Sequence, residues 1–231
     1  MKGKSFIVTG AFGAIGQAVV AELGAAGARV ALIDAAPQLP ANLEPKVGEH
    51  LVLPGVDLTD FPDTQAAVAR VAERFGTVAG LVNIAGGFRW ETVKDGDVAT
   101  WDLMYAVNVK TALHASKAVL PMLLANGWGR IVNIGAAAAS KAAVGMGAYA
   151  AAKSGVMRLT EALAEEAKAH DVTVNAILPS IVDTPANRKD MPDALFSHWV
   201  TPDAIAGTVA FLLSHRADAI TGAGIPVTGR L

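Results

Sequence analysis

The sequence has no cysteine, and aromatic and charged residues make up only 6% and 17% of it. The lack of cysteine excludes disulfides, thiolate nucleophiles and cysteine-ligated zinc or iron–sulfur sites. Basic and acidic residues nearly balance at 19 and 21, and no basic stripe is visible, which argues against nucleic acid as a partner. The five histidines show no metal-ligand spacing, so we expect no metal site.

Hydrophobic residues make up 52% of the 231 positions, and this excess is mostly aliphatic. Such a composition excludes intrinsic disorder and suits a single domain over 1–231 with its own core. No uninterrupted apolar run reaches the roughly 18–20 residues that span a bilayer, and the cleavage site of a signal peptide is missing. We therefore expect a cytoplasmic protein that does not bind membranes.

Apolar runs alternate with helical patterns along the whole chain. The runs show no in/out alternation, as expected for strands covered on both faces. They predict an α/β fold, a doubly wound (Rossmann) parallel sheet of about seven strands with helices on both faces. The segment 184–200 is irregular and is predicted to be a substrate loop, and 35–49 is predicted to be a loop with one short helical turn. The predicted strands are 4–9, 29–33, 51–53, 78–84, 130–134, 172–178 and 225–227; the predicted helices are 14–26, 61–75, 101–126, 148–170 and 201–214.

A glycine-rich turn joins the first predicted strand to the first helix. Glycine lets the chain turn tightly and lets a pyrophosphate approach the helix N-terminus. Asp34 ends the second strand, eighteen residues after Gly16, where a carboxylate accepts from a ribose 2′-hydroxyl. No Arg or Lys follows it to meet a 2′-phosphate, which the carboxylate would repel. A turn that serves packing alone is the alternative, but the context favours NAD(H) over NADP(H). The turn comprises Gly10, Gly13, Ala14, Ile15 and Gly16.

Tyr149 and Lys153 lie four residues apart and so share one helical face. A lysine cation favours the phenolate, so we expect it to lower the pKa of Tyr149 toward neutrality. The phenol could then donate or accept a proton during hydride transfer. An exposed helix pair would show the same spacing, but the place of this pair after the strand at 130–134 favours a catalytic role.

In combination, these motifs resemble the short-chain dehydrogenase/reductase superfamily over nearly the whole chain. Further matches are Asn83-Ile84-Ala85-Gly86, Asn108, and the stretch from Pro179 to Thr184. The resemblance implies that Asn108 anchors the water of a proton relay that runs through Lys153 to Tyr149. It also implies cofactor contacts beyond the glycine turn and Asp34, namely at Asp57, Leu58, Asn83, Ala85, Gly86, Tyr149, Lys153, Pro179, Val182 and Thr184.

The chain departs from the family pattern at the catalytic serine, which normally lies thirteen residues before the tyrosine. Ala136 occupies that position, and an alanine has no hydroxyl to bond a substrate carbonyl. Ser140 lies four residues out of register and is one alternative donor, as is a hydroxyl of a later loop. Otherwise the substrate needs no serine, or catalysis is weak or absent.

Dihydropteridine reductases are a branch of this family that also has alanine at the serine position and prefers NADH. The chain resembles them in Gly145-Met146 and above all in the segment 183–199, although Asn108 links it to standard carbonyl and alcohol dehydrogenases. The predicted function is therefore NAD(H)-dependent hydride transfer to a small, conjugated-ring substrate. Trp90, Met146 and Trp199 are the predicted substrate contacts, with core or interface packing as the alternative for the two tryptophans.

Two other functions stay open at this point. One is a carbonyl, alcohol or 3-oxoacyl reductase that uses another polar group, and the other is an NAD-binding sensor or scaffold. The resemblance also implies a homodimer or homotetramer formed through the two long helices. Their small residues, such as Ala112, Ala115 and Ala118, would permit close packing.

Overall fold

A computed structural model describes residues 1–41, 43 and 50–231, so the expected loop with one short helical turn at 35–49 lies partly outside the described residues. Its centre is a seven-stranded, all-parallel sheet in the order β3-β2-β1-β4-β5-β6-β7. The predicted doubly wound sheet is confirmed. The strands are β1 (Ser5–Thr9), β2 (Arg29–Ile33), β3 (Leu51–Leu53), β4 (Gly80–Asn83), β5 (Gly129–Ile134), β6 (Val172–Pro179) and β7 (Gly224–Val227).

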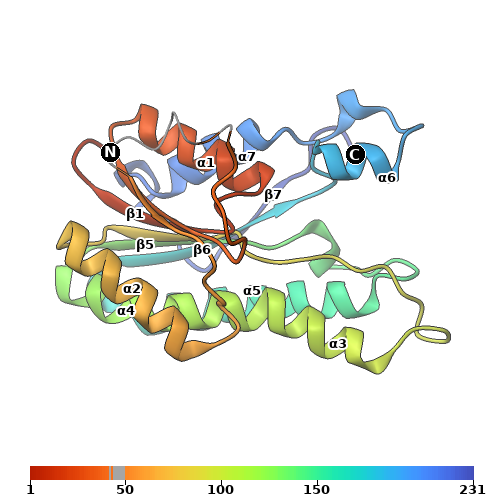
Figure 1. Ribbon diagram of the computed structural model, residues 1–231, viewed down its shortest axis with the longest axis horizontal. Helices are drawn as coiled ribbons and strands as arrows, with labels where there is room; N and C mark the ends of the chain where they lie inside the picture. Colours follow the sequence, from red (N-terminus) through yellow and green to blue (C-terminus); the bar gives the residue numbers. More distant parts are fainter. Residues whose placement is uncertain (42, 44–49) are drawn as a thin grey trace.

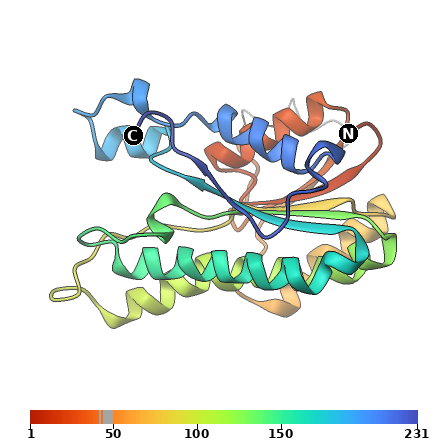
Figure 2. The same ribbon diagram turned by 180° about the vertical axis from the view of Figure 1, so that it is seen from behind.

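Helices cover both faces of the sheet, which explains why its strands are continuous apolar runs. Figure 1 shows α1 (Ala14–Ala25) and α7 (Pro202–Leu212) above the sheet, and α2 (Phe61–Phe75), α4 (Thr111–Asn126) and α5 (Gly147–Ala167) below it. The reverse view in Figure 2 shows the same two layers. The strand order reverses between β1 and β4, and ligands of such sheets bind beyond the carboxyl ends of the strands at this point.

The long helix expected at 101–126 is interrupted. Helix α3 (Val98–Tyr105) begins three residues earlier, and a π-helical turn at Ala106–Lys110 separates it from α4. Such turns carry one extra residue and are frequent at functional sites. Here the turn holds Asn108, whose amide nitrogen donates to the Met104 carbonyl at 3.0 Å.

The expected irregular segment 184–200 contains a short helix, α6 (Pro185–Asp190), and a single 3-10 turn (Phe196–His198). The Thr184 side chain caps α6 by accepting from the Asn187 N–H, and Pro185 occupies the first turn, where its missing N–H costs nothing. The prediction of irregular structure is therefore wrong over α6. Its role as a substrate loop stays a prediction.

The small residues of α4 do not offer the face that was expected for a partner. Ala112 and Ala115 are buried within the chain, and Ala118 packs against the same core. Self-association through these helices therefore stays a prediction. Among the described residues, no helix is both long and apolar enough to cross a bilayer.

Candidate active site

The turn between β1 and α1 forms an open cradle of backbone. Gly10 has φ +62°, and a Cβ there would lie 2.7 Å from the Ala85 nitrogen. A Cβ on Gly16 would lie 2.3 Å from the Gly10 carbonyl oxygen. Gly13 caps α1 without a side-chain hydrogen bond, so the first amides of the helix stay free to meet an anion. The residues present thus fit the pyrophosphate of a dinucleotide.

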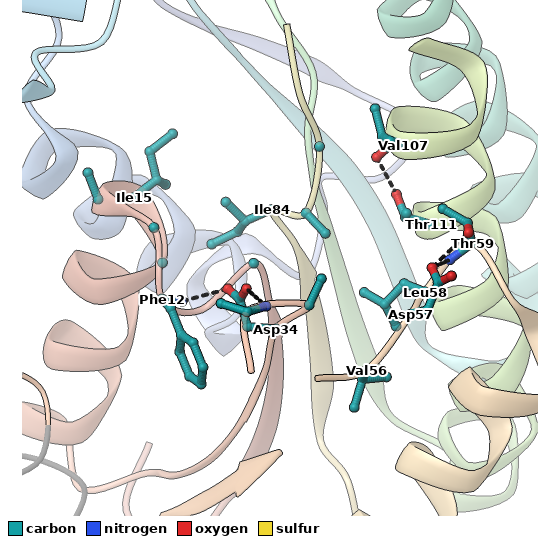
Figure 3. A pocket seen from close by; sticks show the side chains of 18 of the residues that line it. Phe12, Ile15, Asp34, Val56, Asp57, Leu58, Thr59, Ile84, Val107 and Thr111 are labelled. Atoms are coloured by element: carbon teal, nitrogen blue, oxygen red, sulfur yellow. Dashed lines mark hydrogen bonds between the residues drawn. The ribbon is translucent and has the colours of Figure 1, made fainter. Parts of the chain in front are cut away.

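A cavity of about 690 Å³ extends from this cradle past the ends of β2 and β3 (Figure 3). Both oxygens of Asp34 face backbone donors, because Oδ2 accepts from the Phe12 N–H and Oδ1 from the Ala36 N–H, each at 2.9 Å. These bonds orient the carboxylate at the rim that a ribose would meet. Of the predicted cofactor residues, the cavity brings together Gly10, Gly13, Ala14, Ile15, Gly16, Asp34, Asp57, Leu58, Ala85, Gly86 and Thr184.

Asp57 and Leu58 lie across this cavity from the glycine turn (Figure 3). Hydrogen bonds from the Thr59 hydroxyl (2.7 Å) and the Thr59 N–H (2.8 Å) lower the pKa of Asp57. The carboxylate is therefore ionised at neutral pH, as an acceptor for an exocyclic amine requires.

Asn83 is the predicted cofactor residue that the structure places elsewhere. It is buried, and its amide donates to the Asn133 side chain at 2.8 Å and to the Ser116 hydroxyl at 3.0 Å. These bonds join β4 to β5 and α4. Asn83 is not among the residues that line either cavity, so the structure does not place it at the expected cofactor contact. Its hydrogen bonds stabilise the sheet instead.

A second cavity, of about 230 Å³, contains the predicted catalytic residues Tyr149, Lys153 and Asn108. It shares the lining residues Ile15, Ile84 and Gly86 with the first cavity, so the two cavities lie side by side. The predicted Pro179 and Val182 line this second part, as does Ala136. The structure thus brings the Tyr–Lys pair and the alanine at the serine position to one wall of the same space.

Burial, rather than the neighbouring lysine, dominates the electrostatics of this pair. It raises the pKa of the Tyr149 phenol to about 12 and lowers the pKa of the Lys153 ammonium to about 8. The Lys153 nitrogen donates to the Ile134 carbonyl at 2.8 Å and lies 5.9 Å from the centre of the Tyr149 ring. The expected fall in the tyrosine pKa is wrong for this structure, which keeps the phenol protonated as a proton donor.

Asn108 is fixed at the back of the same cavity. Its amide nitrogen donates to the Gly87 carbonyl at 3.0 Å, and its oxygen accepts from the Gly87 N–H at 3.3 Å. A Cβ on Gly86 would lie 2.6 Å from that oxygen and 3.5 Å from the Lys153 nitrogen. A glycine at 86 therefore leaves room for the asparagine and the lysine to face one space.

The hydroxyl nearest in sequence to position 136 does not take the place of the missing serine. The Ala136 side chain is 6% exposed and lines the catalytic cavity. Ser140 is exposed, donates to the Ala137 carbonyl at 2.8 Å, and is not among the residues that line the cavity. The structure therefore rules against Ser140 as the substitute donor.

The expected substrate contacts at Trp90, Met146 and Trp199 are not among the residues that line the catalytic cavity. Trp199 is buried and packs against Phe196 at 4.8 Å between ring centres, so the prediction of a substrate wall is wrong for it. Trp90 lies against Gly145, where an added Cβ would come within 2.1 Å of the indole. Met146 is half-buried at the N-cap of α5.

Phe88 and Ser180 also line the catalytic cavity, although neither was among the predicted site residues. The Phe88 ring packs edge-on against Tyr149, with 5.0 Å between ring centres and an 88° angle between planes. Phe88 lies two residues after the Asn83-Ile84-Ala85-Gly86 motif, and Ser180 lies within the stretch from Pro179 to Thr184. Their place in the sequence was therefore the available signal.

Comparison with known proteins shows the family to which the chain belongs. The family model of the short-chain dehydrogenases matches residues 4–194, and the chain belongs to this family. The nodulation protein G of Azospirillum brasilense is 35% identical over 100% of this chain and 99% of its own. The 3-oxoacyl-[acyl-carrier-protein] reductase of Pseudomonas aeruginosa is 33% identical over 99% and 97%. A solved NAD⁺-bound xylitol dehydrogenase is 27% identical, with a TM-score of 0.91 over 99% of this chain and 98% of that one.

The chain is therefore an oxidoreductase that uses a nicotinamide cofactor. The family, and the convergence of Tyr149, Lys153 and Asn108 on one cavity, set aside a sensor or scaffold without catalysis.

Proposed function

We propose that the protein is an NADH-dependent reductase of a small conjugated-ring substrate of the quinonoid dihydropteridine type. One observation carries this proposal: the wall at Ala136 offers a methyl group where a hydroxyl would meet a substrate carbonyl. An aliphatic ketone gathers charge on one oxygen as it is reduced, and losing one preorganised donor there costs about 10²–10³ in rate. A conjugated acceptor spreads that charge over its ring and needs such a donor less.

The residues of the cavity support this chemistry. NADH supplies a hydride when it is bound, and reduction of the ring needs one proton besides. Tyr149 holds that proton, because burial keeps the phenol protonated, and its hydroxyl forms no hydrogen bond with any other described residue. After the transfer, Lys153 would return a proton to the phenolate through a relay whose water Asn108 would anchor, as the family resemblance implies. The resemblance of segment 183–199 to dihydropteridine reductases supports the same substrate class.

The test is NADH oxidation by the purified protein with quinonoid dihydropterin as acceptor, corrected for the reaction without enzyme. We expect saturable turnover that yields one tetrahydropterin for each NADH consumed. Absence of pterin turnover, alongside good turnover of an aliphatic ketone, would refute the proposal.

The cofactor preference gives a further expected result. A 2′-phosphate would approach the Asp34 carboxylate, and repulsion between such groups predicts a kcat/KM for NADH on the order of 100-fold above that for NADPH. Asp34→Ser removes the repulsion and should bring the two values within about tenfold of each other. Paired steady-state kinetics at one ionic strength measure both. Equal or better use of NADPH by the parent would contradict this preference.

The pKa of Lys153 predicts how the rate of the reduction depends on pH. Its ammonium loses the proton as pH rises through about 8, whereas Tyr149, with a pKa of about 12, stays protonated. We therefore expect kcat to be level below about pH 8 and to fall above it. Lys153→Arg keeps the positive charge, so the fall in kcat above about pH 8 should disappear. The pH-independent kcat of this variant should be lower than that of the parent. The same fall in kcat with Lys153→Arg would assign it to another group.

A carbonyl or 3-oxoacyl reductase is the second candidate function. A relative that is named a 3-oxoacyl-[acyl-carrier-protein] reductase and is 33% identical favours it, as does the position of Asn108. Substitution at Ala136 separates the two candidates.

A further inference from the structure

Ser180, directly after β6, is a second hydroxyl-bearing residue in the lining of the catalytic cavity. Among the described residues that line this cavity, only Tyr149 and Ser180 carry side-chain hydroxyls. Ser180 is half-buried, and no role has so far been given to its side chain. Its contacts show what that hydroxyl can do.

The strand register places Ser180 beside the alanine wall. Ile134 of β5 pairs with Ile177 of β6, and the Gly135 N–H donates to the Ile177 carbonyl at 2.8 Å. Counting two residues onward on each strand puts Ala136 level with Pro179. Neighbouring strands lie about 4.8 Å apart. Ser180 thus follows one residue beyond the level of Ala136, on the adjacent chain segment.

The hydrogen bonds of Ser180 determine whether its hydroxyl acts as a donor or an acceptor toward the cavity. Its hydroxyl lies 2.8 Å from the Thr228 carbonyl, which can only accept, so the serine proton is committed to that bond. Its own N–H donates to the Val227 carbonyl at 3.3 Å, which anchors the residue to the end of β7. The oxygen keeps lone pairs for the cavity, so Ser180 acts there as an acceptor.

We propose that Ser180 determines substrate specificity by accepting a hydrogen bond from an N–H of the bound ring while Tyr149 donates a proton to it. This inference rests on the proposed function and narrows it. The cavity holds a donor and an acceptor, so it selects a ring that carries an acceptor and an N–H. A dihydropteridine meets both requirements, whereas a quinone without N–H groups meets only the first.

The experiment compares two acceptors, quinonoid dihydropterin and an unsubstituted naphthoquinone, with NADH as the donor. For Ser180→Ala we expect kcat/KM to fall about tenfold with the dihydropterin and by less than about twofold with the quinone, because only the first loses a hydrogen bond. Ser180→Thr keeps the hydroxyl and should stay within about threefold of the parent on both. Ser140→Ala, which lies outside the cavity, is the matched control and should leave both values unchanged. Thermal unfolding and the Kd for NADH are measured for every variant.

The outcomes separate this inference from the function on which it rests. Suppose that the parent reduces the dihydropterin, but that Ser180→Ala lowers kcat/KM by the same factor on both acceptors or leaves it unchanged on both. The role of Ser180 is then refuted and the proposed function stands. A weaker Kd for NADH in Ser180→Ala, with an unchanged ratio between the acceptors, would assign the hydroxyl to the cofactor and also refute the role. If the parent reduces only an aliphatic ketone, the proposed function falls and the inference falls with it.

Discussion

Tyr149→Phe is expected to lower kcat for dihydropterin reduction by about 10³-fold, within the 10²–10⁴ range typical of a lost general acid. Phenylalanine keeps the ring and its edge-on contact with Phe88 and removes only the proton donor. The Kd for NADH should stay within about twofold, and the free energy of unfolding within about 0.5 kcal/mol, because the hydroxyl bonds no other described residue. Steady-state kinetics, fluorescence titration and thermal unfolding measure the three quantities.

The chain supplies a matched control for this substitution. Tyr105, the other tyrosine, is 51% exposed on α3 and is not among the residues that line either cavity. Tyr105→Phe should therefore leave kcat unchanged. A Tyr149→Phe variant that kept more than about a tenth of the parent kcat would show that the proton comes from elsewhere.

Ala136→Ser is expected to raise kcat/KM for a 3-oxoacyl thioester or an aliphatic ketone by about 10²–10³-fold. The added hydroxyl would face the space that Tyr149 faces, where a localised oxyanion needs a second donor. Dihydropterin reduction should change by less than about threefold, because little charge gathers on one atom of that ring. Parallel assays on both substrates measure the change in their ratio.

The control for this variant is Ala138→Ser. Ala138 lies in the 3-10 turn Ala137–Ala139 and is not among the residues that line the cavity. Ala138→Ser should alter neither activity. If Ala136→Ser leaves ketone reduction unchanged, the missing serine does not limit that reaction, and the argument for a conjugated substrate loses its basis.

The fold could be predicted from the sequence where local signals and tertiary packing agree. Helix α2 begins and ends where expected, because Asp60 caps it, a proline lies in its first turn, and Gly76 ends it with φ +75°. The π-helical turn could not be predicted, since the bonds that hold Asn108 reach Gly87, which lies far away in the sequence. Likewise, α6 was missed because Pro185, in its first turn, and Pro192, just after it, resemble the prolines of a loop.

The same distinction between local signals and tertiary packing applies to the candidate site. Tyr149 and Lys153 could be predicted, because motif spacing and the position after a strand identify them, and Asn108 could be predicted from the family resemblance. Their pKa values could not, because these depend on how deeply the folded chain buries each group. Trp199 was a poor prediction for a related reason: flatness suits a substrate wall, but packing buries this side chain.

A competition assay tests the central claim most directly. The parent protein receives limiting NADH with equal concentrations of quinonoid dihydropterin and a 3-oxoacyl thioester, and mass spectrometry quantifies both products against a reaction without enzyme. The account predicts that tetrahydropterin accounts for nearly all the NADH consumed. Hydroxyacyl thioester as the main product would contradict it and would make this chain a reductase of localised carbonyls.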